Sequence, residues 1–321
     1  MNTSTGPSAG ATGAVTTAPA APAADAPKIV PLRHYGQWIF AAIVLLFLAK
    51  LVYDVATGSS IRWEKVGSRV FAEAIMQGLL ITIMLTVVSM ILGIIGGITL
   101  AVMRISSNAV LRAISSGFVW IFRGTPILVQ ILIWFNLALF FPQIDLVFVQ
   151  LDTNALILPL TAAVLGLAAN ESAYMSEIIR GGIISIDPGQ KEAAEALGMT
   201  QGKIMFRIIL PQALRSIVPP MGNELVTLLK ETSLVSVIGA GDLLTRAQQI
   251  GAADFSRMEM LLVASIWYLI LTSIASIGQG FLERKLGKSR GFATPEPVWK
   301  RVLNSILPNR RSVGTSREGL R

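Results

Sequence analysis

Long apolar stretches constrain this chain more than any other feature of its sequence. A helix needs about 20 residues, at about 1.5 Å each, to cross about 30 Å of hydrocarbon. Five stretches meet that need clearly: 37–54, 76–102, 124–141, 155–178 and 259–281. A sixth, 213–236, carries polar residues that neighbouring helices would have to shield from lipid. The pattern predicts an all-α integral membrane protein with six transmembrane helices.

Composition excludes most other classes. Apolar residues make up 53% of the chain and charged residues 14%, which is far from the balance of a soluble domain. Ten of the 27 Lys and Arg follow Leu282, where they would meet anionic lipid headgroups, so the positive charge does not call for nucleic acid. There is no cysteine and one histidine, His34. We expect no metal site and no cofactor on this chain.

The chain divides into four predicted regions. Residues 1–36 form a disordered leader, because 1–27 are mostly Ala, Pro, Thr, Gly and Ser. Residues 37–73 add an N-terminal transmembrane helix and an external loop. The main transmembrane domain is 74–285, followed by a basic cytoplasmic tail, 286–321. Apolar residues recur at helical spacing from Val298 to Leu307, which predicts an interfacial helix in that tail.

Basic residues in short flanks predict the orientation in the membrane. The connections 103–123 and 179–212 carry Arg and Lys and should be cytoplasmic, whereas 142–154 has two Asp and no basic residue and should be external. Three basic residues in 59–73 run against this bias. With six spans, both termini lie in the cytoplasm.

The connection 179–212 contains a short predicted helix. Glu192-Ala193-Ala194 begins a run of strong helix formers that ends at Gly198, a residue able to adopt the left-handed conformation. Asp187 and Pro188 suit its start. The two alanines keep one face small enough for a partner to approach, and Glu192 offers a carboxylate to a partner arginine. An amphipathic helix resting on lipid is the simpler alternative.

At this point the sequence resembles a known family, the permeases of ABC importers. The match lies in the spacing of Glu192, Ala193, Ala194, Gly198, Ile208, Leu210 and Pro211. The resemblance implies the type I permease fold, with this loop as the coupling helix that docks on a cytoplasmic ATPase. Pro211 also suits the first turn of the next helix.

Flanking motifs resemble the branch that carries polar amino acids: Phe122–Pro126, Glu177–Gly182 and Lys230–Leu234. The resemblance covers roughly 74–285 and implies the permease subunit of an ATP-driven importer in the bacterial inner membrane. It also implies three partners: an ATPase dimer that hydrolyses ATP, a periplasmic amino-acid-binding protein and a second permease subunit, identical or not. This chain itself would catalyse no reaction.

Polar residues inside the apolar spans are the candidates for the substrate path. They are Asn170, Glu171, Tyr174, Glu224, Thr227 and Glu231. Glu224, Thr227 and Glu231 share one helix face by their spacing. Three acids favour a cationic amino acid, while interhelical hydrogen bonds and ion pairs are the competing explanation for each residue.

Other functions fit the sequence less well. Intramembrane acids could serve proton or ion coupling in a secondary transporter or channel, but the loop motif and the absence of an inverted repeat oppose that. A membrane scaffold or sensor leaves the intramembrane polar residues without a role. Gly287-Lys288-Ser289 lacks the rest of a phosphate-binding loop. Gly93 and Gly97 could allow two helices to approach closely, with a dimer contact or internal packing as alternatives.

Overall fold

The computed structural model describes residues 35–58, 61–146 and 149–287. The predicted leader, most of the basic tail and the expected tail helix lie outside these residues. The chain separates into two compact units, Met1–Gly58 and Ser59–Arg321. In the first unit the described part is one helix, α1 (Tyr35–Thr57), whose large apolar side chains are exposed along its length. An exposed apolar helix of this length suits lipid.

The second unit is built mainly from helices. The long ones are α3 (Glu73–Ile105), α4 (Ala109–Gly124), α7 (Pro159–Ile184), α10 (Leu210–Glu231) and α12 (Arg257–Gly287). Shorter elements connect them: α2 (Trp63–Arg69), α5 (Ile127–Phe135), η1 (Leu137–Leu139), α6 (Thr153–Leu156), α8 (Pro188–Ala196), α9 (Gln201–Ile204), the π-helical η2 (Met205–Ile209), η3 (Thr232–Ile238) and α11 (Leu243–Ala253).

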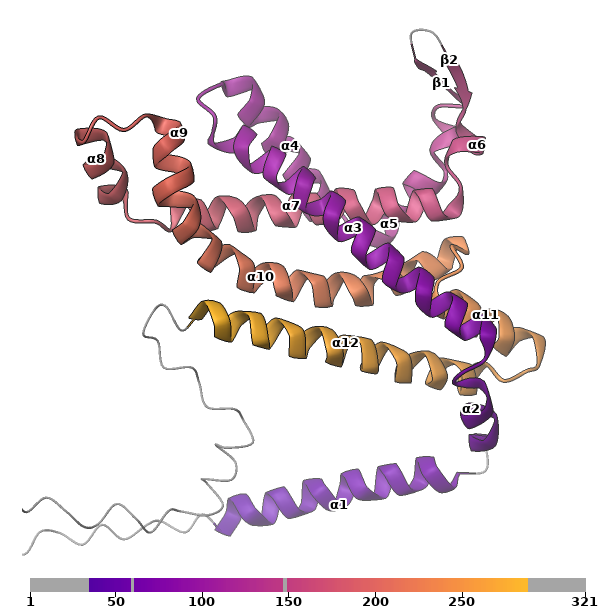
Figure 1. The fold of residues 1–321 in the computed structure, drawn as a ribbon. Coiled ribbons are helices and arrows are strands. Elements are labelled where there is room, and N and C mark those ends of the chain that lie inside the picture. Colours follow the sequence, from indigo (N-terminus) through magenta and orange to yellow (C-terminus); the bar gives the residue numbers. More distant parts are fainter. Residues whose placement is uncertain (1–34, 59–60, 147–148, 288–321) are drawn as a thin grey trace, which may run out of the picture. The chain divides into compact units, whose positions relative to one another are not determined.

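Helices α7, α10 and α12 lie side by side, and α3 runs across α7 (Figure 1). Small residues allow the α3–α7 crossing to be close. A Cβ atom added to Gly93 would lie 2.4 Å from Cγ of Glu171, and one added to Gly97 would lie 2.3 Å from Cβ of Met175. Both glycines are buried. The Gly93/Gly97 pair therefore serves packing within the chain, and the alternative of a dimer contact is not supported.

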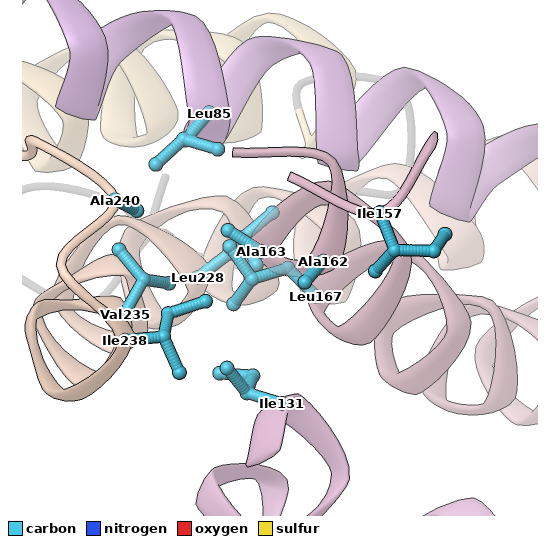
Figure 2. Packing of buried hydrophobic residues seen from close by; sticks show 10 residues of the cluster. All are labelled: Leu85, Ile131, Ile157, Ala162, Ala163, Leu167, Leu228, Val235, Ile238 and Ala240. Atoms are coloured by element: carbon cyan, nitrogen blue, oxygen red, sulfur yellow. The ribbon is translucent and has the colours of Figure 1, made fainter. Parts of the chain in front are cut away.

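The largest apolar core of the described residues lies where α3, α5, α7, α10 and η3 meet (Figure 2). Leu85 of α3 faces Leu167 of α7 and Leu228 of α10, and Ile131 of α5 closes the cluster. Val235 of η3 is fully buried in the same core. This core fixes α7 and α10 relative to each other, and these two helices carry the predicted substrate-path residues.

The third predicted span, 124–141, is wrong in its bounds. Helix α4 begins at Ala109, where the Asn108 side chain accepts a hydrogen bond from the backbone N–H of Val110 at 2.9 Å. It ends at Gly124, and α5 continues after a bend of 105°. Pro126 explains the break, because the residue before a proline avoids the helical conformation. The predicted cytoplasmic connection 103–123 is thus largely helix.

The expectation of an all-α fold also needs a correction. Strands β1 (Gln143–Leu146) and β2 (Val149–Asp152) form an antiparallel hairpin in which Gln143 pairs with Asp152. Among the described helices, three are long and apolar enough to cross a membrane, or four if α4 and α5 form one span. These helices make the chain a multi-pass membrane protein. Helices α7 and α10 have 26 and 22 residues but carry more polar side chains.

Helix α2 is anchored to the turn between α11 and α12. Arg62 Nε donates to Glu259 Oε1 at 2.9 Å, and Trp267 Nε1 donates to the Val70 carbonyl at 2.8 Å. Asp254 in that turn accepts a hydrogen bond from the Ser256 hydroxyl, which lowers the pKa of the Asp254 carboxyl, and nearby basic groups of 65–69 add to the effect. The basic residues that run against the orientation bias thus have acidic partners within the chain.

Candidate functional site

The loop around α8 has the shape that its sequence predicts. The Asp187 carboxylate accepts a hydrogen bond from the Gly189 N–H at 2.9 Å, and Pro188 occupies the first turn. At the other end Gly198 has φ of +71°. Its N–H bonds to the Glu195 carbonyl, and the next N–H bonds to the Ala194 carbonyl, which is the Schellman arrangement. The backbone reverses direction with its terminal groups satisfied.

The two alanines of the loop differ in environment. Ala194 is 2% exposed and packs against Ile204 and Ile209, with Ile208 beside them. Ala193 is exposed. The expectation that both alanines serve a partner's approach is therefore wrong for Ala194, because that side chain fills the loop's own core. Its small size lets α8 pack closely on the segment that leads into α10.

Several side chains on the outer surface of the loop are exposed. Glu192 is exposed, and no ion pair is recorded for it among the described residues. Leu197 is 82% exposed and Phe206 is 71% exposed. Sequence reasoning missed these two, although an apolar residue before the terminal glycine was a visible signal. The loop therefore combines a satisfied interior with an exposed, partly apolar outer face.

Residues Leu210 and Pro211 begin α10, as expected for a proline in a first turn. The π-helical segment η2 precedes them and contains Phe206 and Ile208. Such segments widen a helix and change which way its side chains face. The chain from Gln201 to Glu231 is therefore continuous helix, and α8 joins it through the turn at Gly198, where Ala194 packs against Ile204 and Ile209.

The predicted acidic residues come together inside the membrane domain. Glu171 of α7 is 2% exposed, and its carboxylate interacts electrostatically with Glu224 and Glu231 of α10. Its Oε1 atom is buried with no hydrogen-bond partner among the described residues. Thr227 lies on the same helix, between the two α10 acids in sequence. We call Glu171, Glu224 and Glu231 the acidic set.

This arrangement departs from what buried acids normally show. A buried carboxylate is usually hydrogen-bonded or paired with a cation, since an unpaired one is costly to keep in a protein interior. The described residues contain no group of three or more His, Cys, Asp or Glu that could hold a metal ion.

The side chain of Asn170 is hydrogen-bonded, unlike the Oε1 atom of the neighbouring Glu171 among the described residues. Its amide Nδ2 donates to the Phe122 carbonyl at 2.9 Å and to Gln130 Oε1 at 3.2 Å. Gln130 in turn donates to the carbonyls of Phe122 and Thr125. These bonds satisfy backbone groups that the bend between α4 and α5 leaves free. The side chain of Asn170 is directed to this bend, which no local sequence pattern indicates.

A group of basic residues surrounds Glu177, one turn beyond Tyr174. Arg104 of α3 bonds to Oε1 of Glu177, and Arg180 donates to Oε2 at 2.9 and 3.2 Å. Arg123 of α4 lies 3.6 Å from Oε1, with its guanidinium 5.1 Å from the centre of the Tyr174 ring. Sequence reasoning used these arginines for orientation, and Arg123 and Arg180 also as parts of the branch motifs, but it missed that they converge on Glu177.

Comparison with known proteins identifies the family to which this chain is similar. Residues 89–288 match the family described as the binding-protein-dependent transport system inner membrane component. The arginine transport system permease protein ArgU of Corynebacterium glutamicum is 44% identical over 260 residues, which cover 80% of this chain and 82% of that protein. The arginine transport system permease protein ArtQ of Bacillus subtilis is 43% identical over 212 residues, 66% of this chain and 92% of that protein.

The fold has solved counterparts. A crystal structure of an amino acid ABC transporter with histidines matches with a TM-score of 0.60 and 35% identity, over 67% of this chain and 95% of that one. The inward-facing methionine transporter MetNI, at 21% identity and a TM-score of 0.54, shares the fold. The chain belongs to the binding-protein-dependent transport system inner membrane components and is a permease subunit of an ABC importer.

Proposed function

We propose that this chain imports a cationic amino acid across the bacterial inner membrane, through six spans with both termini in the cytoplasm. The six spans are α1, α3, the bent pair α4–α5, α7, α10 and α12. In this proposal 1–36 is a leader, 37–73 adds the first span, 74–285 is the permease domain and 286–321 is a cytoplasmic tail. The relatives that transport arginine support the choice of a cationic cargo.

The observation that carries the proposal is the unpaired carboxylate of Glu171. Its Oε1 atom has no hydrogen-bond partner in the described part of the chain, and two further acids of α10 interact with the same side chain. A cationic amino acid supplies two positive groups, the α-ammonium and the side chain. Binding them would replace like-charge repulsion by charge-assisted hydrogen bonds. The substrate path would therefore run between α7 and α10, with Thr227 and Tyr174 beside the acids.

The partners follow from the loop and the family. A cytoplasmic ATPase dimer would dock on the outer face of the loop, made of Glu192, Ala193, Leu197 and Phe206. A periplasmic binding protein would deliver the amino acid, and a second permease subunit would complete the path. Because α8 packs on Ile204 and Ile209, in the helical segment that continues into α10, closure of the ATPases would move α10 and its acids with the loop.

Reconstituted transport tests the proposal. Proteoliposomes with this permease, its ATPase and its binding protein should take up labelled arginine only with internal ATP. Unlabelled arginine or lysine should compete, whereas glutamate and leucine should not. Uptake without ATP would favour the secondary transporter or channel. Competition by neutral or acidic amino acids alone would contradict the cationic cargo while leaving the family assignment intact.

A further inference from the structure

Three arginines surround a single carboxylate at Glu177. The oxygen Oε1 already accepts a bond from Arg104, and Oε2 accepts two from Arg180. Both oxygens are thus engaged before Arg123 is considered. The four groups together carry a net positive charge of two, in a partly covered place. Glu177 therefore does not need Arg123 as a partner, and Arg123 remains a surplus cation.

The Arg123 guanidinium is held in place without being saturated. Its only ion pair, at 3.6 Å, is too long for a hydrogen bond, and no hydrogen bond from it is recorded among the described residues. The Tyr174 ring lies under it at 5.1 Å and limits its orientation. The side chain is 43% exposed and faces a cavity of about 420 Å³ that Trp120 also lines. Its planar donors are available to a ligand in that cavity.

The position of Arg123 relates it to the acidic set. It interacts electrostatically with Glu224, one of the two α10 acids. Tyr174, which lies under Arg123, is three residues from Glu171 on α7, so the two residues are neighbours along one helix face. A fixed cation therefore stands at one edge of a group of acids. That distribution is complementary to an amino acid, which carries a carboxylate beside its ammonium group.

We propose that Arg123 binds the α-carboxylate of the transported amino acid, in the cavity between α4 and α7. This inference rests on the proposed function, because it takes the cargo to be an amino acid. The guanidinium would bind the carboxylate through two parallel N–H donors. The acidic set would hold the positive groups of the same molecule. Arg123 thereby selects a free carboxylate, while the acids select the side chain.

Direct binding to the purified permease–ATPase complex, without the binding protein, tests this assignment. The probes are arginine and its α-amide, which lacks the carboxylate charge. The wild-type complex should bind arginine about tenfold to hundredfold more tightly than the amide, as expected for a charge-assisted pair. Arg123→Gln should bring this ratio close to one, and Arg123→Lys should restore part of it.

Arg180→Gln is the matched control, because it removes another cation from Glu177. It should keep the arginine-to-amide ratio of the wild type. An unchanged ratio in Arg123→Gln, or an equal loss in both variants, would overturn the assignment and leave Arg123 a structural partner of Glu177. ATP-driven arginine uptake by a wild-type complex that shows no direct binding would also contradict it. If the wild-type transporter takes up no arginine at all, the proposed function fails instead.

Discussion

The cytoplasmic loop and the acidic set differ in whether their polar groups have partners. In the loop, Asp187 caps α8 and Gly198 ends it, so the backbone groups at both ends are bonded. In the membrane domain, the buried Oε1 of Glu171 has no hydrogen-bond partner within the ranges that the structure describes. A segment whose polar groups are hydrogen-bonded within the chain needs no ligand to complete its bonds. A buried polar group without such a bond is a candidate contact for a ligand. The difference supports the proposal that the loop transmits motion and that the acidic set binds cargo.

The largest expected effect compares the two alanines of the loop. Ala194→Trp would force a large ring into the core beside Ile204 and Ile209, which should destabilise the loop by more than about 3 kcal/mol. Ala193→Trp places the same ring on the exposed face. Limited proteolysis should cut the loop of Ala194→Trp and spare that of Ala193→Trp, while both variants lose ATPase co-purification. Equal protease resistance would mean that the loop's interior is not packed as described.

The close contact between Gly93 of α3 and Glu171 provides the next test. Gly93→Ala would place a methyl group 2.4 Å from Cγ of Glu171, so the carboxylate or the α3–α7 crossing must shift. We expect a loss of about 1–3 kcal/mol and reduced uptake. Gly278→Ala is the control, since a Cβ there meets nothing within 4 Å. Normal melting temperature and uptake in Gly93→Ala would contradict the close crossing.

A smaller effect is expected at the turn of the loop. A Cβ at Gly198 meets nothing within 4 Å, so a substitution there acts only through its positive φ. Gly198→Ala should cost about 1 kcal/mol, Gly198→Val more, and Gly198→Asn less, because asparagine tolerates the left-handed region. The affinity for the ATPase, measured by titration, should be highest for Gly198→Asn, lower for Gly198→Ala and lowest for Gly198→Val. A flat series would show that the chain reversal does not matter for docking.

The two regions also differ in how much the sequence revealed. The loop is encoded by adjacent residues, so Asp187, Pro188 and Gly198 predicted its start and end. The acids were found because apolar spans contain few charges. Their meeting depends on the packing of α3, α7 and α10, which no local pattern specifies. The hydrogen bonds of Asn170 and the approach of Arg123 to Glu177 could not be predicted for the same reason, since their partners lie on other helices.

Two local signals were available and were not used. Thr125-Pro126 marks the break between α4 and α5, and Asn108 marks the start of α4. Because the apolar run continues across the proline, neither signal was recognised, and the predicted bounds of the third span were wrong. The hairpin of β1 and β2 lies in the segment 142–154, which was predicted only as an external connection.

The substitution Glu171→Gln tests the central claim most directly. If the acidic set is a cargo site, replacing the buried carboxyl group, whose Oε1 has no hydrogen-bond partner among the described residues, by an amide of the same shape should stabilise the permease by about 1 kcal/mol. Arginine uptake should fall at least about tenfold, as expected when a charged group loses its partner. Glu192→Gln, on the exposed loop, should leave the melting temperature unchanged. A raised melting temperature with lost uptake and retained ATPase is the predicted result, whereas a lowered melting temperature with normal uptake would contradict the account.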